Sequence, residues 1–158
     1  MGGRGAYIGL SGSGSGRSSI GFSKTYESKS GGSVHTEASR IEQSKMNKQE
    51  RAKYNKEHDM CKHLADNGHN VVHLDDRKLS SGSYDILLDG KKAELKSLSS
   101  YNNIVREGKS AIKKQGANLV VFRFDTLSAK AKSNLKDLAK AKIHGCYYVK
   151  GQKGLEWF

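Results

Sequence analysis

Apolar residues recur every three or four positions in three separate parts of the chain. The first is residues 47–67, where Gly68 follows as a residue suited to end a helix. The same spacing returns in residues 103–115 and in residues 128–142, and Ser128 is suited to cap the last of these. The pattern therefore predicts three helices, each with one apolar face turned toward a core.

Short apolar runs lie between and after these helices and predict β-strands: residues 70–74, 84–88, 91–97, 118–124 and 146–149, with 155–158 as a further edge. Asp89 and Gly90 separate the second run from the third, and Asp-Gly favours a two-residue type I′ hairpin turn. The predicted order is α-β-β-β-α-β-α-β. This order favours an α/β (α+β) fold in which helices flank a mixed central sheet.

The N-terminal part of the chain has a different composition. Ten of the eighteen glycines fall within residues 1–32, among many serines. Glycine and serine provide little side chain to bury, so such a segment gains too little to offset its ordering entropy. The composition predicts a flexible arm or linker over residues 1–42 and a folded domain over residues 43–158.

The charge of the chain indicates which partners to expect. Lysine and arginine total 28 against 16 acidic residues, which gives a net charge of +12 and an isoelectric point of about 9.7. Such a balance favours polyanions, nucleic acid before anionic membranes, although lysines that only face water would give the same number. Mean hydropathy is −0.72, and we expect neither a membrane span nor a Sec signal. The two cysteines indicate a reducing compartment.

The predicted hairpin brings chemistry-bearing side chains together. Counting back from the turn, Asp85 lies opposite Glu94 with Cβ atoms about 4.5–5.5 Å apart, and Lys96 shares their face. Two facing carboxylates repel, so they need a shared proton or a cation, and a hard divalent cation suits oxygen ligands. Lys96 could then orient water or stabilise charge on a phosphate, which points to metal-dependent phosphodiester cleavage. The alternative is an exposed hairpin face on which Lys92 and Lys96 merely neutralise the acids.

Asp85, eight further residues and then Glu94-Leu95-Lys96 resemble the D…(D/E)xK core of the PD-(D/E)xK nuclease superfamily. More narrowly, the segments ADNGHNVVHL (65–74) and GSYDILLDGKKAELKS (82–97) resemble CdiA-type C-terminal toxin nucleases, many of which cleave tRNA. The resemblance covers roughly residues 50–150. Tyr84 stands where the superfamily motif has proline.

The resemblance implies a restriction-endonuclease-like core and a site for one or two divalent ions, Mg²⁺ first, with Mn²⁺ or Zn²⁺ as alternatives. Asp85 and Glu94 would be metal ligands together with the backbone carbonyl of Leu95, and Lys96 would position the nucleophile or support the transition state. The superfamily often adds a glutamate from the first helix. Glu57 is the candidate for this third catalytic and metal-binding acid, because it shares the stripe of apolar residues on that helix.

Substrate contacts are expected elsewhere on the same domain. Gln115 resembles a motif glutamine found after ExK in some members, and Lys113, Lys114 and Arg123 could bind the nucleic-acid backbone. His73 and His69, at the ends of the first predicted strand, could contact substrate or act as acid or base.

The hypothesis that follows is a toxin-type metal-dependent RNase acting on tRNA. A DNA endonuclease of a phage or mobile element with the same site is the first alternative, and an inactive nucleic-acid-binding module is the second. The family further implies an acidic immunity protein, delivery to a target cell and action in its cytoplasm.

Overall fold

The computed structural model describes residues 21–79, 81–99 and 101–158. One eight-stranded mixed sheet runs through them, and its spatial order β1 to β8 follows the order of the chain. The strands are β1 (Phe22–Glu27), β2 (Ser33–Glu37), β3 (Asn70–His73), β4 (Ile86–Leu88), β5 (Lys91–Leu98), β6 (Leu119–Phe124), β7 (His144–Val149) and β8 (Glu156–Trp157). The helices are α3 (Ala38–Ser44), α4 (Lys48–Asp66), α5 (Ile104–Lys113) and α6 (Ala129–Lys140), with 3₁₀ turns η2 (Asp76–Lys78) and η3 (Tyr101–Asn103).

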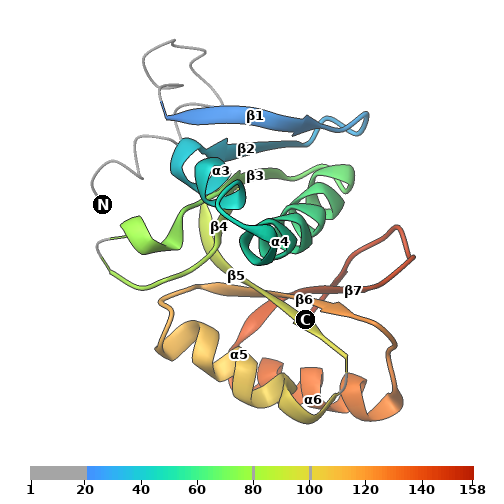
Figure 1. Cartoon of the computed structure of the whole chain (residues 1–158). Helices are drawn as coiled ribbons and strands as arrows, with labels where there is room; N and C mark the ends of the chain where they lie inside the picture. The colour runs from blue at the N-terminus through green and yellow to red at the C-terminus, as the bar shows by residue number, and fades with distance from the viewer. Residues whose placement is uncertain (1–20, 80, 100) are drawn as a thin grey trace.

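Helices cover both faces of the sheet, as the predicted fold class requires (Figure 1). On one face, the apolar stripe of α4 packs on side chains such as Val71, Ile86 and Leu95. On the other, α5 and α6 pack on the alternate residues of β6, including Phe122 and Phe124. The α/β prediction is therefore confirmed, and the two cores explain why β6 reads as a nearly continuous apolar run.

The three predicted helices correspond to α4, α5 and α6, within a few residues at each end. Asn47 caps α4 by accepting the backbone N–H of Glu50, and Ser128 caps α6 by accepting that of Ala131. Gly68, at φ +91°, follows α4 in the left-handed conformation expected of a helix end. The predicted element order holds from α4 to β7, and β8 adds the last edge strand.

The prediction of a flexible arm through residue 42 is wrong for residues 22–42. These residues form β1, β2 and most of α3, with β1 antiparallel to β2 and β2 parallel to β3. Composition misleads here because β1 is an edge strand that buries little, while Val34 and Thr36 are completely buried in β2. Residues 1–20 of the predicted arm lie outside the described residues.

The β4–β5 hairpin has the predicted turn and register. Asp89 and Gly90 have φ angles of 50° and 87°, and Leu88 pairs with Lys91 while Ile86 pairs with Ala93. The Asp89 carboxylate also accepts the backbone N–H of Asn70 at 2.8 Å, which ties the turn to the start of β3. The turn thus fixes which residues of the two strands face each other.

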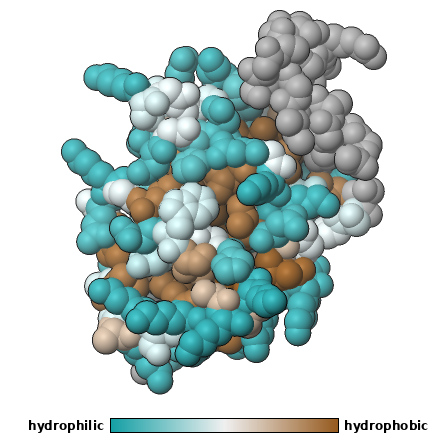
Figure 2. All heavy atoms as spheres, turned by 180° about the vertical axis from the view of Figure 1, so that it is seen from behind, coloured by the Kyte–Doolittle hydropathy of each residue, from teal (hydrophilic) through white to brown (hydrophobic). Residues whose placement is uncertain are grey.

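The surface is largely hydrophilic around the rim of the face seen from behind, with apolar atoms gathered toward its middle (Figure 2). Among the described residues, the exposed large apolar side chains are Met46 and Trp157. None of the described helices is both long enough and apolar enough to cross a bilayer.

Candidate functional site

Two carboxylates, one half-buried and one buried, meet where β4 begins. Asp85 immediately precedes β4, and its Oδ2 accepts the backbone N–H of Leu95 at 3.0 Å. Glu94 lies on β5, is only 4% exposed and interacts with Asp85. Burial, followed by the repulsion of Glu94 and Glu57, raises the pKa of Asp85 far above its usual range, and burial also raises the pKa of Glu94. We call Asp85 and Glu94 the acid pair.

Lys96 stands beside the acid pair. Its Nζ lies 3.3 Å from Oε2 of Glu94 and 3.1 Å from Oε1 of Glu107 on α5. Successive side chains of a strand point to opposite faces, so Glu94 and Lys96 share a face that Leu95 does not. The structure thus places Asp85, Glu94 and Lys96 close together.

Glu57 has a different environment. Its Oε1 accepts one hydrogen bond from the Arg40 guanidinium at 3.0 Å and lies 3.1 Å from Nε2 of His73. Burial alone would raise the pKa of Glu57, but His73 and Arg40 outweigh it and the pKa is lowered. Burial lowers the pKa of His73 and so favours its neutral form, whereas the Arg40 guanidinium stays charged. We therefore attribute the anionic state of Glu57 chiefly to Arg40.

The contacts around Glu57 continue into a polar network. The Tyr54 ring stacks on His58 and on His73, with ring centroids 5.3 and 5.4 Å away, and the two imidazole centroids lie 6.1 Å from each other. The Arg40 guanidinium lies over the Tyr54 ring. Nε2 of His58 lies 2.8 Å from the hydroxyl of Thr25, and burial lowers the pKa of His58 to about 4. The network joins α4 to β1, α3 and β3, so it ties the N-terminal strands to the rest of the domain.

The donor set can be tested against a divalent cation. Among residues 21–79, 81–99 and 101–158, no group of three or more His, Cys, Asp or Glu side chains is arranged to hold a metal, so Glu57 does not complete a ligand cluster with the acid pair. The pair itself does fit a cation. Oε1 of Glu94 is buried with no hydrogen-bond partner among the described residues, and both acids have raised pKa values.

Gln115 lies next to the segment that leads into Asp85. Its backbone oxygen accepts the N–H of Ser83 at 2.9 Å, and a Cβ on Gly82 would lie 2.5 Å from that oxygen, so glycine permits the close approach. Oε1 of Gln115 is buried with no hydrogen-bond partner among the described residues. Lys113 and Lys114, just before it, are exposed.

Arg123 is separated from these groups. It pairs in register with Ser97, and its Nη1 donates to the Ser97 hydroxyl at 3.2 Å. Since Ser97 and Lys96 are successive residues of β5, Arg123 lies on the opposite face of the sheet from Lys96. His69 instead contacts Asp89 through Nδ1 at 2.6 Å, at the hairpin turn.

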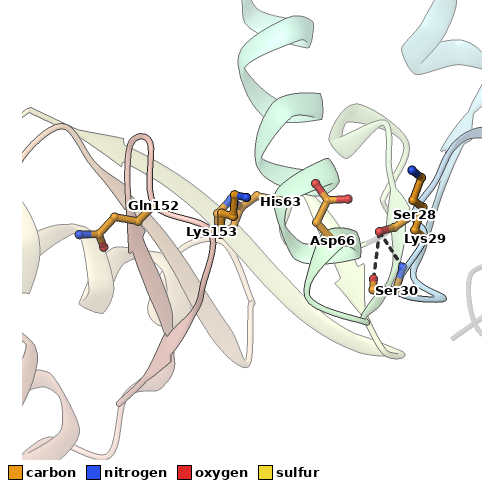
Figure 3. Close-up of a pocket in the computed structure, with 7 residues that line it drawn as sticks. All are labelled: Ser28, Lys29, Ser30, His63, Asp66, Gln152 and Lys153. Atoms are coloured by element: carbon orange, nitrogen blue, oxygen red, sulfur yellow. Dashed lines mark hydrogen bonds between the residues drawn. The ribbon is translucent and has the colours of Figure 1, made fainter.

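A pocket of about 430 Å³ lies away from the acid pair, between the β1–β2 turn, the end of α4 and the β7–β8 turn (Figure 3). It is lined by Ser28, Lys29, Ser30, His63, Asp66, Gln152 and Lys153. The β7–β8 turn, which lines this pocket, lies on the opposite side of the molecule in Figure 1 from η2, the 3₁₀ turn that follows β3. None of the residues proposed from the sequence lines this pocket.

Sequence reasoning missed Arg40 and Glu107. Arg40 falls in the segment expected to be an arm, and Glu107 is one of several charged residues on a helix without special spacing. An acid in the first turn of the helix after the ExK strand was the one available signal for Glu107.

Neither a family model nor a curated protein sequence matches this chain. Among solved structures, the chain is similar to a chain of the CdiA-CT/CdiI toxin and immunity complex from Burkholderia pseudomallei, with a TM-score of 0.56. The match has 15% sequence identity and covers 71% of this chain and 88% of that chain. At this identity the similarity shows a shared fold.

Proposed function

We propose that the chain is a metal-dependent nuclease of the toxin type and that its favoured substrate is tRNA. The single observation that carries the proposal is the convergence of Asp85, Glu94 and Lys96 at one end of the β4–β5 hairpin. Two adjacent acids whose pKa values are raised by loss of solvent contact are costly to keep ionised beside each other, and a cation would relieve both. The net charge of +12 suits a polyanionic substrate.

Asp85 and Glu94 would hold a divalent ion, Mg²⁺ first, with the carbonyl of Leu95 as a further oxygen ligand. Such an ion supplies Lewis-acid chemistry at a phosphate and lowers the pKa of bound water. The Leu95 N–H holds Oδ2 of Asp85 in place. The Lys96 ammonium would donate to a phosphate oxygen and stabilise the negative charge that grows there in the transition state.

The choice of a toxin acting on tRNA has two supports. The segments 65–74 and 82–97 resemble CdiA-type toxin nucleases, and the fold is shared with a chain of a toxin and immunity complex. A toxin of this kind would act in the cytoplasm of a target cell and would bind an acidic immunity protein. Exposed Lys113 and Lys114, near the segment before Asp85, would bind the nucleic-acid backbone.

A second candidate is an inactive nucleic-acid-binding module. The observation in its favour is that Glu57 is already paired with Arg40 and His73, so the acid pair has only two carboxylates to offer a metal. This candidate predicts binding that is unaffected by EDTA and no cleavage products.

The test is incubation of the purified chain with tRNA, total RNA and plasmid DNA, each with Mg²⁺, Mn²⁺, Zn²⁺ or EDTA. We expect cleavage of tRNA with Mg²⁺ or Mn²⁺, none with EDTA and none for Asp85→Asn. Cleavage of plasmid alone would identify a DNA endonuclease with the same site. Intact nucleic acid under every condition, with retained binding, would leave the second candidate.

A further inference from the structure

The Lys96 ammonium is held by carboxylates from two different elements. Glu94 lies two residues away on β5, with its Oε2 at 3.3 Å, and Glu107 comes from α5, with its Oε1 at 3.1 Å. The Lys96 side chain is 16% exposed, so it has little freedom to choose another position. These two contacts therefore determine where the ammonium lies.

Glu107 sits on a firmly packed helix. Ile104, Gly108 and Ala111 of α5 are buried, and they recur at helical spacing on the face turned to the core. A Cβ on Gly108 would lie 2.8 Å from both terminal methyl groups of Leu138, so glycine lets α5 approach α6 closely. This packing fixes the position from which Glu107 reaches Lys96.

The two carboxylates differ in what else they do. Glu94 belongs to the acid pair and would turn to a cation bound there, whereas Glu107 comes from another element and keeps its contact with the ammonium. We infer that Glu107 is a positioning residue that holds Lys96 toward the substrate phosphate while Glu94 binds the cation. This inference rests on the proposed function and extends it to a residue outside the D…ExK motif.

The kinetic test compares Glu107→Gln and Glu107→Asp with Asp137→Asn, which removes an exposed acid from the neighbouring helix. We expect Glu107→Gln to lower kcat about 10- to 100-fold with little change in KM, as removal of supporting contacts commonly does. Glu107→Asp keeps the charge and should recover part of the loss, and Asp137→Asn should behave as wild type. Titration with Mn²⁺ should give the same affinity for wild type and Glu107→Gln.

A second readout does not depend on cleavage. Acylation of Lys96 by an N-hydroxysuccinimide ester, followed by mass spectrometry, should proceed several-fold faster in Glu107→Gln than in wild type or Asp137→Asn. If the wild-type chain cleaves nothing, the proposed function fails while this comparison still tests the contact.

Three results would overturn the inference. They are unchanged kcat in Glu107→Gln, unchanged acylation of Lys96, and a large loss of Mn²⁺ affinity, which would make Glu107 a metal ligand instead. Should Glu107→Gln fail to fold, Glu107→Asp carries both measurements, and wild-type values for kcat and acylation in that variant would contradict the inference.

Discussion

Two groups of acids, each at least partly shielded from water, have pKa values shifted in opposite directions. Glu57 lies 3.0 Å from the Arg40 guanidinium and 3.1 Å from His73, and its pKa is lowered. Asp85 and Glu94 lie against each other, and burial raises the pKa of both. All three side chains are carboxylic acids, so the opposite pKa shifts come from the neighbouring groups that the fold places beside them.

This difference separates a structural task from a chemical one. In the network around Glu57 the Arg40 guanidinium supplies the positive charge. The contacts of this network connect α3 and the N-terminal strands to α4. The acid pair has Lys96 on one oxygen of Glu94 and leaves the other buried without a partner among the described residues. An incomplete arrangement of this kind destabilises the protein unless a ligand completes it, which is typical of functional sites.

Removing the Lys96 ammonium, which lies beside the acid pair, should strongly lower activity. Lys96→Ala should lower kcat by about 10²- to 10³-fold, because the transition state loses a charged donor. Lys91→Ala is the matched control, since Lys91 is an exposed lysine on the same strand. Cleavage rates measured on tRNA with Mg²⁺ decide this, and a Lys96→Ala rate within tenfold of wild type would remove Lys96 from the mechanism.

Breaking the contact between Glu57 and Arg40 should lower the stability of the fold. Glu57→Gln leaves the buried Arg40 guanidinium without its carboxylate and should lower the free energy of unfolding by about 3 kcal/mol. Urea denaturation measures this change. Glu42→Gln, which removes a carboxylate that is 71% exposed, should change it by less than about 0.5 kcal/mol. Equal effects of the two variants would contradict the role assigned to the network.

Removing the charge repulsion within the acid pair should have a smaller effect on stability, and it should stabilise the fold rather than destabilise it. Asp85→Asn removes one of two repelling acids, so without added metal it should raise the Tm by roughly 2–4 °C at neutral pH. Since both pKa values are raised, wild type loses stability as pH rises from the ordinary values of 3.8 and 4.5. The gain of Asp85→Asn should therefore vanish below about pH 3.8. A lower Tm at neutral pH would contradict the raised pKa of Asp85.

Local signals made the hairpin predictable. Asp89-Gly90 determines a two-residue turn, and the turn determines the register of β4 against β5 up to the pair Ile86–Ala93, next to which Asp85 and Glu94 lie. The helix caps and the apolar run of β6 are local in the same sense. These features depend on neighbours in sequence, so the pattern of residues was sufficient to predict them.

The remainder depends on contacts between distant segments. Val34 is fully buried in a strand flanked by serine, glycine and charged residues, so composition hides its place in the sheet. The pairing of Arg40 with Glu57, and of Glu107 with Lys96, appears only when three or more elements are packed together. For this reason Glu57 was expected beside the acid pair as a metal ligand, while the structure gives its Oε1 to Arg40 and His73.

The most direct test of this contrast is calorimetric titration of the metal-free chain with Mn²⁺. The account predicts that wild type binds, that Asp85→Asn loses binding, and that Glu57→Gln retains it under conditions where that variant is folded. It also predicts that binding weakens as the pH is lowered, because protons compete with the cation for an acid pair whose pKa values are raised. Equal binding by wild type and Asp85→Asn would contradict the assignment of the cation to the acid pair.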